Sequence, residues 1–174
     1  MRRAKSRRSN SKKPVSGCGH RESRSPLCGR QLDLMSFRRP VSVLVVVHSD
    51  AGDVLLLRRS SPFDFWQSVT GSLKDDELHA DAAARELFEE TGLTDEGVLS
   101  FSGVSRTFVI DPRWQYKFGP GVVENVEYEW RYRLPQKPDI VINDDEHSEY
   151  RWVSVEEAIA KVWSWTNRDA LKLL

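Results

Sequence analysis

The sequence contains only two cysteines, Cys18 and Cys28, and it has no long apolar run. Two thiols with His20 nearby do not complete a tetrahedral zinc site, so we assign these residues no role. No segment is apolar over the roughly 20 residues that a membrane-spanning helix needs. No internal repeat is present, and a chain of 174 residues is long enough for one domain with its own core. We therefore expect a single domain and no membrane partner.

The sequence also lacks a net charge, but its charges are unevenly distributed. Residues 1–40 contain 12 lysines and arginines against 2 acids, whereas the rest of the chain has a net charge of −10. We expect residues 1–36 to form a basic, disordered extension, because they hold little that could build a core. Met35 begins a segment that resembles a natural protein start, which favours a start-site artefact or a passive tail. A nucleic-acid role would rest on these charges alone, so we expect no nucleic-acid partner and place the folded domain at residues 37–174.

Hydrophobic periodicity predicts several strands in this domain. Val41–Val47 is a continuous apolar run, which is typical of a strand buried on both faces. Val126–Leu134 alternates between apolar and charged residues, so we predict a half-buried strand whose charged face meets solvent. Ser154 and Glu157 form a capping box that opens a helix through about Val162. Further strands are predicted at 54–57, within 99–110, at 140–142 and at 150–153, and a last helix after residue 167. This mixed order indicates an α/β protein.

The segment Asp81–Thr91 predicts a helix, because its alanines and leucine favour one and Gly92 can end it. Glu86, Glu89 and Glu90 are spaced so that three carboxylates share one face of this helix. Each like-charge pair costs roughly 0.2–0.5 kcal/mol. A divalent cation would reverse the sign of this effect, because Mg²⁺ prefers hard oxygen ligands and can bridge substrate phosphates. The alternative is an ordinary amphipathic helix with a solvated acidic face.

The spacing around this helix is more specific than its charge. The segment from Gly71 to Leu93 fits the pattern G-x5-E-x7-R-E-U-x-E-E-x-G-U, with U aliphatic, at all nine specified positions. The chain therefore resembles the Nudix hydrolases, in which this pattern is known as the Nudix box; in this chain the box is Gly71–Leu93. This resemblance implies an α/β/α sandwich with a mixed β-sheet, Mg²⁺ as the usual ion with Mn²⁺ as a substitute, and hydrolysis of a diphosphate linked to another group. Gly71 would let the backbone turn tightly and bring a carbonyl near the metal.

The same resemblance assigns roles by position. Glu86, Glu89 and Glu90 are implied metal ligands, and Arg85 is implied to orient a glutamate through a bidentate contact. Nudix enzymes often take a general base from outside the box, and Glu146 is our choice for this role and for a further metal ligand. The alternatives near it are other acids of the same loop, namely Asp144, Asp145 and Glu149.

Segments outside the box resemble a narrower group of Nudix hydrolases, those that act on dihydroneopterin triphosphate. The most specific are Phe65–Ser72 and Ser164–Arg168, and the likeness runs from about Phe37 to the C-terminus. By position it implies substrate contacts at Arg38, Arg59, Thr70, His147 and Ser164. The implied reaction is the hydrolysis of 7,8-dihydroneopterin 3'-triphosphate to the monophosphate and pyrophosphate, in folate biosynthesis in the cytoplasm. Residues 113–117 would stack on the ring or simply cap the core.

Three alternatives remain at the level of the sequence. A broad nucleoside-triphosphate pyrophosphatase would share every box residue and differ only in how it recognises the base. A dinucleoside-polyphosphate hydrolase is a variant of that possibility. A non-catalytic binding module with the same fold would usually carry a broken box, whereas the box here is intact. The sequence leaves the oligomeric state open.

Overall fold

A parallel pair of long strands forms the centre of the fold. The computed structural model describes residues 37–174, so the extension expected at residues 1–36 lies outside the described part. Strand β1 (Val41–Ser49) pairs in parallel with β6 (Glu124–Leu134) over its whole length. The predicted apolar run is confirmed as a buried central strand, because Val43–Val47 are all buried.

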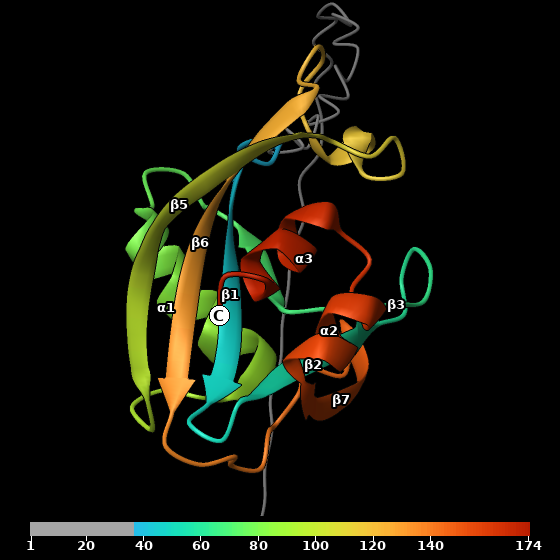
Figure 1. Ribbon diagram of the computed structural model, residues 1–174. Coiled ribbons are helices and arrows are strands. Elements are labelled where there is room, and N and C mark those ends of the chain that lie inside the picture. The colour runs from blue at the N-terminus through green and yellow to red at the C-terminus, as the bar shows by residue number, and fades with distance from the viewer. Residues whose placement is uncertain (1–36) are drawn as a thin grey trace, which may run out of the picture. The chain divides into compact units, whose positions relative to one another are not determined.

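Five further strands complete a mixed, seven-stranded sheet (Figure 1). Strand β5 (Val98–Val109) runs antiparallel to β6 at one edge. On the other side β1 pairs with β4 (Val69–Ser72) and with β2 (Asp53–Arg59). Strand β2 in turn pairs with β3 (Phe65–Gln67) and β7 (His147–Ser154). The chain therefore brings the start of the box, in β4, directly beside the central strand.

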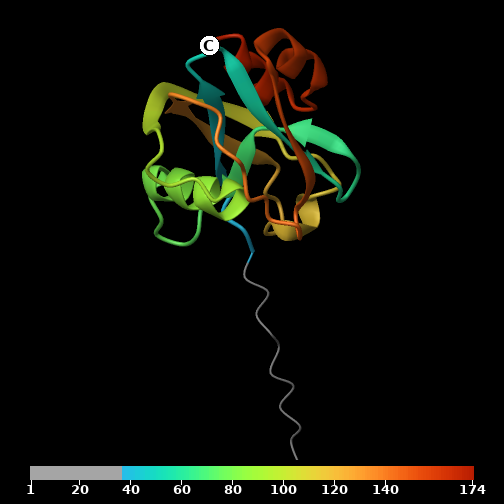
Figure 2. The same cartoon turned by 90° about the horizontal axis from the view of Figure 1, so that it is seen from below.

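Helices cover both faces of the sheet (Figure 2). Helix α1 (His79–Thr91) packs on one face, and α2 (Val155–Lys161) and α3 (Trp165–Leu171) pack on the other. The predicted capping box is confirmed, because the Ser154 hydroxyl accepts a hydrogen bond from the amide of Glu157. A short 3₁₀ helix, η1 (Gln115–Lys117), interrupts the connection from β5 to β6. The expected α/β/α sandwich is thus confirmed for residues 37–174, where no helix is long and apolar enough to cross a membrane.

Each face of the sheet has its own apolar core. Between the sheet and α1, alternate residues of β1 and β2 pack against Ala82, Ala83 and Leu87. Between the sheet and the C-terminal helices, the intervening residues of β1 and β2 pack against Ala158, Val162, Ala170 and Leu171. Burial on both faces explains why β1 and β2 read as continuous apolar runs without alternation.

Two sequence-based predictions about the strands were wrong. Ile140–Ile142 does not form a strand, and Ile140 instead packs into the α1 core from a loop. The charged face of β6 meets solvent only at its end, because Arg133 is exposed whereas Glu127 and Glu129 are 6% and 0% exposed. Strand β6 lies at the centre of a sheet that is covered on both sides, so its polar face points toward the layer that contains α3. Alternation in a sequence cannot reveal whether a second layer covers the polar face.

Candidate active site

Helix α1 presents its three glutamates to different environments. Glu90 is 1% exposed and Glu86 is largely buried, whereas Glu89 is exposed. The buried side of the helix therefore runs through Ala82, Ala83, Leu87 and Glu90, whereas Ala84 is exposed. Two of the three carboxylates thus lie toward the sheet, which excludes the alternative of a fully solvated acidic face.

Glu86 lies against the backbone of Gly71 in β4. A Cβ atom at residue 71 would overlap the carboxylate of Glu86. Gly71 pairs with Val43 in regular strand geometry and lies outside the positive-φ glycines, so the tight turn expected there was wrong. The box requires glycine here because any side chain would displace the glutamate from the edge of the sheet.

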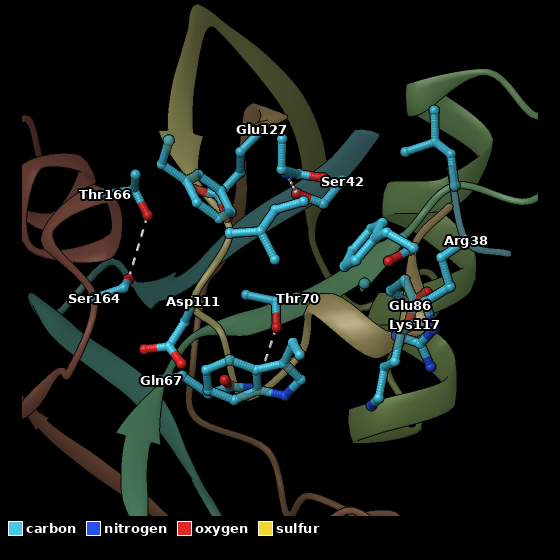
Figure 3. A pocket seen from close by; sticks show the side chains of 18 of the residues that line it. Arg38, Ser42, Gln67, Thr70, Glu86, Asp111, Lys117, Glu127, Ser164 and Thr166 are labelled. Carbon is cyan, nitrogen blue, oxygen red and sulfur yellow. Dashed lines mark hydrogen bonds between the residues drawn. The ribbon is translucent and has the colours of Figure 1, made fainter. Parts of the chain in front are cut away.

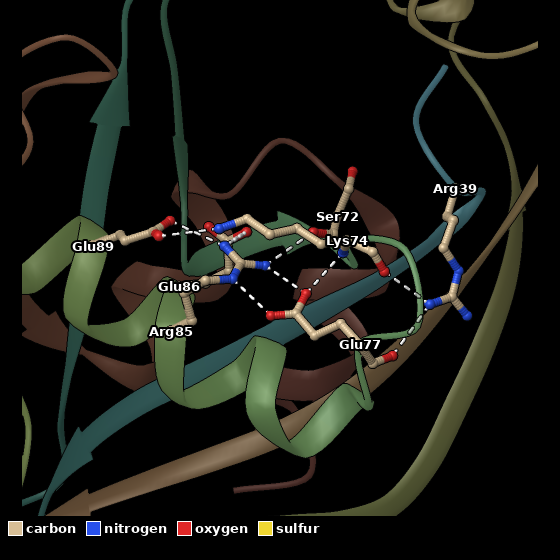
Figure 4. A network of polar contacts seen from close by, with 7 residues as sticks. All are labelled: Arg39, Ser72, Lys74, Glu77, Arg85, Glu86 and Glu89. Carbon is tan, nitrogen blue, oxygen red and sulfur yellow. Dashed lines mark hydrogen bonds and ion pairs between the residues drawn. The ribbon is translucent and has the colours of Figure 1, made fainter. Parts of the chain in front are cut away.

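Arg85 connects the box into one network (Figure 4). It makes the expected bidentate contact, and the partner is Glu77: Nε lies 2.7 Å from Oε1, and Nη2 lies 2.9 Å from Oε2. Its Nη1 donates to Glu86 at 2.6 Å and to Glu89 at 3.0 Å, and Nη2 also donates to the carbonyl of Ser72. All five N–H groups of the guanidinium thus donate to these four residues, so none is left to bind substrate. Arg85 therefore positions carboxylates.

A second acidic group lies beside this network. One ligand atom each from Glu90, Glu146 and His147 falls within 4.8 Å of the others. His147 is buried, and its Nε2 lies 3.2 Å from Oε2 of Glu90, although the pair is not aligned as a hydrogen bond. Both carboxylate oxygens of Glu90 are thus buried without a hydrogen-bond partner. A buried carboxylate without hydrogen bonds is costly, and a divalent cation would satisfy it, so the donor set fits a metal ion.

The pKa values of these acids reflect the same geometry. Burial raises the pKa of Glu90, and it raises that of Glu86 to about 7 against the opposing effect of Arg85. The hydrogen bonds from Arg85 instead lower the pKa of Glu77 to about 2. Glu77 is therefore a permanent anion that anchors Arg85, whereas Glu86 and Glu90 lack enough positive charge around them. A cation at this position would supply it.

A cleft with a volume of about 1010 Å³ opens next to the box. One end gathers positive charge, because Arg38 and Lys117 lie there beside Glu86 (Figure 3). Arg59 and Glu146 also line the cleft, and both lie near Lys117. Burial and the two nearby arginines lower the pKa of Lys117. Arg59 Nη1 lies 2.9 Å from Oε2 of Glu146. A cluster of cations with no more than one such ion pair suits an anionic ligand with several charges, such as a polyphosphate.

The structure brings most of the predicted site residues to this cleft. Its lining includes Arg85, Glu86, Glu89, Glu146, Arg38, Arg59, Thr70 and Ser164. Thr70 accepts a hydrogen bond from Gln67, and Ser164 also caps α3 by accepting from the amide of Asn167. Glu90 and His147 are not part of the lining and lie buried beside Glu146. Of residues 113–117, Trp114 and Lys117 line the cleft, whereas Arg113 forms an ion pair with Asp111 and stacks over Phe63.

Sequence reasoning missed the polar residues at the other end of the cleft, which are Ser42, Asn125, Glu127 and Thr166. Three of them project from β1 and β6 on the face that looks toward α3. A signal was present, because Ser42 interrupts an apolar strand and Glu127 lies on the polar face of another. Only the pairing of Ser42 with Glu127 in the sheet brings these signals together.

Comparisons with known proteins agree with this geometry. The sequence model of the NUDIX domain matches residues 38–174. The dihydroneopterin triphosphate diphosphatase of Escherichia coli K12 is 38% identical over 140 residues, covering 78% of this chain and 92% of the relative. The protein of the same name from Haemophilus influenzae is 35% identical over 143 residues, covering 80% and 89%. The solved structure of the E. coli dihydroneopterin triphosphate pyrophosphohydrolase superposes with a TM-score of 0.74 at 36% identity, covering 79% of this chain and 96% of that one. The box is intact, the fold is the expected sandwich, and the sequence model of the NUDIX domain matches almost all described residues. This chain therefore belongs to the Nudix family.

Proposed function

We propose that this protein is a Mg²⁺-dependent hydrolase that converts 7,8-dihydroneopterin 3'-triphosphate to dihydroneopterin monophosphate and pyrophosphate, a step of folate biosynthesis. The observation that carries the proposal is the buried, unsatisfied carboxylate of Glu90 beside a cation-lined cleft. The named relatives, which the chain covers over most of their length, support the choice of substrate.

Four carboxylates are the proposed metal ligands, those of Glu86, Glu89, Glu90 and Glu146. Glu90 and Glu146 already lie close together, and Arg85 holds Glu86 and Glu89 on the neighbouring turn of α1. A bound Mg²⁺ would neutralise phosphate oxygens and lower the pKa of bound water. Mn²⁺ has similar ligand preferences and would substitute.

The chain's own side chains bind and orient the triphosphate. Arg38, Arg59 and Lys117 face the end of the cleft where Glu86 and Glu146 lie, so they would hold phosphate oxygens there. Phosphoryl transfer depends mainly on such positioning and on charge neutralisation. Thr70 and Ser164 offer hydroxyl groups to the rest of the substrate.

Glu146 is the proposed general base. Its carboxylate lines the cleft and pairs with Arg59, which fixes its orientation. It would accept a proton from the attacking water, and the proton then leaves to solvent through the open cleft. His147 is buried against Glu90 and would hold that carboxylate in place rather than touch substrate.

A substrate panel tests the proposal. The purified protein is assayed with Mg²⁺ against dihydroneopterin triphosphate, GTP, dATP and diadenosine tetraphosphate, with detection of pyrophosphate and of the nucleoside product. We expect the highest kcat/KM for dihydroneopterin triphosphate, with pyrophosphate released, because buried polar groups matched to a ring edge discriminate strongly. A higher kcat/KM for GTP or dATP would leave a general nucleoside-triphosphate pyrophosphatase. An absence of turnover on every substrate would favour a binding module.

A further inference from the structure

Two buried acids on the same face of β6 differ in their partners. Glu129 is 0% exposed, and it is paired with Arg106 at 2.7 Å and with Arg131 at 3.3 Å. Glu127 is 6% exposed and makes no ion pair among residues 37–174, and its Oε1 is buried without a hydrogen-bond partner. Burial of an unsatisfied carboxylate is destabilising. The fold therefore accounts for Glu129, whereas Glu127 lacks a structural role that would offset its burial.

Glu127 lines the cleft at the end away from the phosphate-binding cations. Figure 3 shows it near Ser42 and Thr166, while Arg38, Lys117 and Glu86 lie at the opposite side of the cleft. Apolar and aromatic side chains line the cleft as well, and they include Phe108, Ile110 and Trp165. Phe108 is the cross-strand partner of Asn125, two residues before Glu127. Phe108 therefore places an aromatic side chain beside a buried acceptor at this end of the cleft, which suits a polar heteroaromatic ring.

Ser42 supplies a donor next to that acceptor. Ser42 in β1 is the register partner of Glu127 in β6, so both side chains project from neighbouring strands. The Ser42 hydroxyl oxygen accepts a hydrogen bond of 2.7 Å from Nδ2 of Asn125. Its own proton is therefore free to be donated to a ligand. The pair presents an acceptor and a donor side by side.

We propose that Glu127 and Ser42 recognise the edge of the substrate ring that carries an amino group, a ring N–H and an oxo group in sequence. The amino group and the N–H would donate to the Glu127 carboxylate, and the oxo group would accept from the Ser42 hydroxyl. A pterin ring has this edge, and so does guanine, whereas adenine does not. The inference rests on the proposed function for the substrate class, and it makes Glu127 a specificity-determining residue.

The charge state of Glu127 agrees with this assignment. Burial raises its pKa to about 7, against the opposing effects of the Thr166 hydroxyl and Arg106. Two N–H donors from a ring would stabilise the ionised form and satisfy the oxygen that has no partner in the protein. A ring without the amino group would leave part of this carboxylate unpaired.

Binding of GTP and of ITP tests the inference, because the two differ only by the amino group. Dissociation constants are measured by isothermal titration calorimetry without Mg²⁺, so that no turnover occurs. We expect the wild type to bind GTP more tightly than ITP by about 10- to 100-fold, as for one hydrogen bond to a charged group. In Glu127→Ala and Glu127→Gln the ratio should fall close to one. Glu124→Gln, an exposed acid at the start of the same strand, should keep the wild-type ratio.

A ratio of affinities separates recognition from a damaged fold, which would weaken both ligands equally. No preference for GTP in the wild type, or a preference that both Glu127 variants retain, would overturn the inference. The substrate panel decides the proposed function independently. A protein that prefers dihydroneopterin triphosphate but shows no dependence on Glu127 would keep the function and lose this inference. A protein that prefers another triphosphate with a Glu127-dependent GTP/ITP ratio would do the reverse.

Discussion

The carboxylate of Glu86 occupies the space that a side chain at residue 71 would need. A side chain larger than that of glycine at residue 71 of β4 is thus incompatible with the observed position of the Glu86 carboxylate on α1. Helix α1 ends at Gly92, which adopts a φ of 74° and donates its amide to the carbonyl of Phe88. The two glycines of the box are therefore required for different reasons. Gly71 allows a side chain to approach closely, and Gly92 adopts the left-handed conformation that ends the helix.

Gly71→Ala should lower turnover by about 100-fold or more, because a displacement of about 1 Å at a catalytic group costs that much. The new methyl group must push the Glu86 carboxylate away from its position beside Arg85. The measurement is kcat/KM at saturating Mg²⁺. Gly119→Ala is the matched control, since its Cβ would make only ordinary contacts with Phe37 and Val122. Wild-type turnover in Gly71→Ala would show that the position of Glu86 is unimportant.

Glu90→Gln should abolish turnover and raise the melting temperature of the metal-free protein. The substitution removes a buried charge that has no hydrogen-bond partner. Mg²⁺ should stabilise the wild type, by about 2.7 kcal/mol at 100 times its Kd, and should stabilise the variant far less. Differential scanning fluorimetry with and without EDTA measures both effects, and Glu156→Gln on the surface of α2 is the control. Equal Mg²⁺ stabilisation of both proteins would remove Glu90 from the metal site.

The box shows how far the sequence alone can go. Its spacing predicted α1 and the crowding of acids, because those features follow from local patterns within about 25 residues. The α/β/α sandwich was instead implied by the resemblance to the Nudix hydrolases. The bidentate partner of Arg85 is Glu77, eight residues earlier, and this pairing depends on how the loop after β4 folds back. Nothing in the spacing shows that Glu90 is buried while Glu89 is exposed.

The polar end of the cleft could not be predicted, for a different physical reason. Ser42 and Glu127 are far apart in sequence, and only the parallel pairing of β1 with β6 makes them neighbours. The alternation of Val126–Leu134 predicted a strand, and the strand was found, but its charged face was assigned to solvent. The buried acids of that face contact Thr166 in α3 and Arg106 in β5, and neither residue contributes to the local pattern.

Glu146→Gln should lower kcat by about 10²- to 10⁴-fold, the usual contribution of a general base. Asp144→Asn and Asp145→Asn are the matched controls, because both are exposed in the same turn while Glu146 lines the cleft and pairs with Arg59. Steady-state kinetics with the preferred triphosphate measures the effect. Small and equal losses at all three positions would move the base to the box helix.

Deletion of residues 1–34 should leave turnover and melting temperature unchanged. Residues 37–174 supply two apolar cores, the acidic group and the lining of the cleft. The first 34 residues are rich in arginine and serine and offer little apolar surface for docking. Kinetics and thermal melts of the shortened protein, compared with the full chain in the same buffer, measure both properties. A marked loss of either would place the extension within the working enzyme.

Without metal, the free energy of unfolding should fall as the pH rises from about 5 to 8. Burial raises the folded-state pKa of Glu86 and Glu127 to about 7 from an unfolded value of 4.5, so the native state binds protons more tightly in this range. Stability is then lost as each proton leaves, by at most about 1.4 kcal/mol per pH unit and group. His48 acts in the opposite direction, because burial lowers its pKa and its protonation destabilises the fold.

Comparison of variants isolates one of these groups. Glu127→Gln removes a titrating carboxylate of nearly the same shape, so the decrease in melting temperature between pH 5 and pH 8 should be smaller than in the wild type. Glu124→Gln, exposed on the same strand, should show the full wild-type decrease. Mg²⁺ should reduce the decrease in all three proteins, since it binds the ionised form of its carboxylate ligands, Glu86 among them. A melting temperature of Glu127→Gln that follows the wild-type pH curve would mean that Glu127 titrates near its unfolded value and is not buried as a carboxylate without a partner.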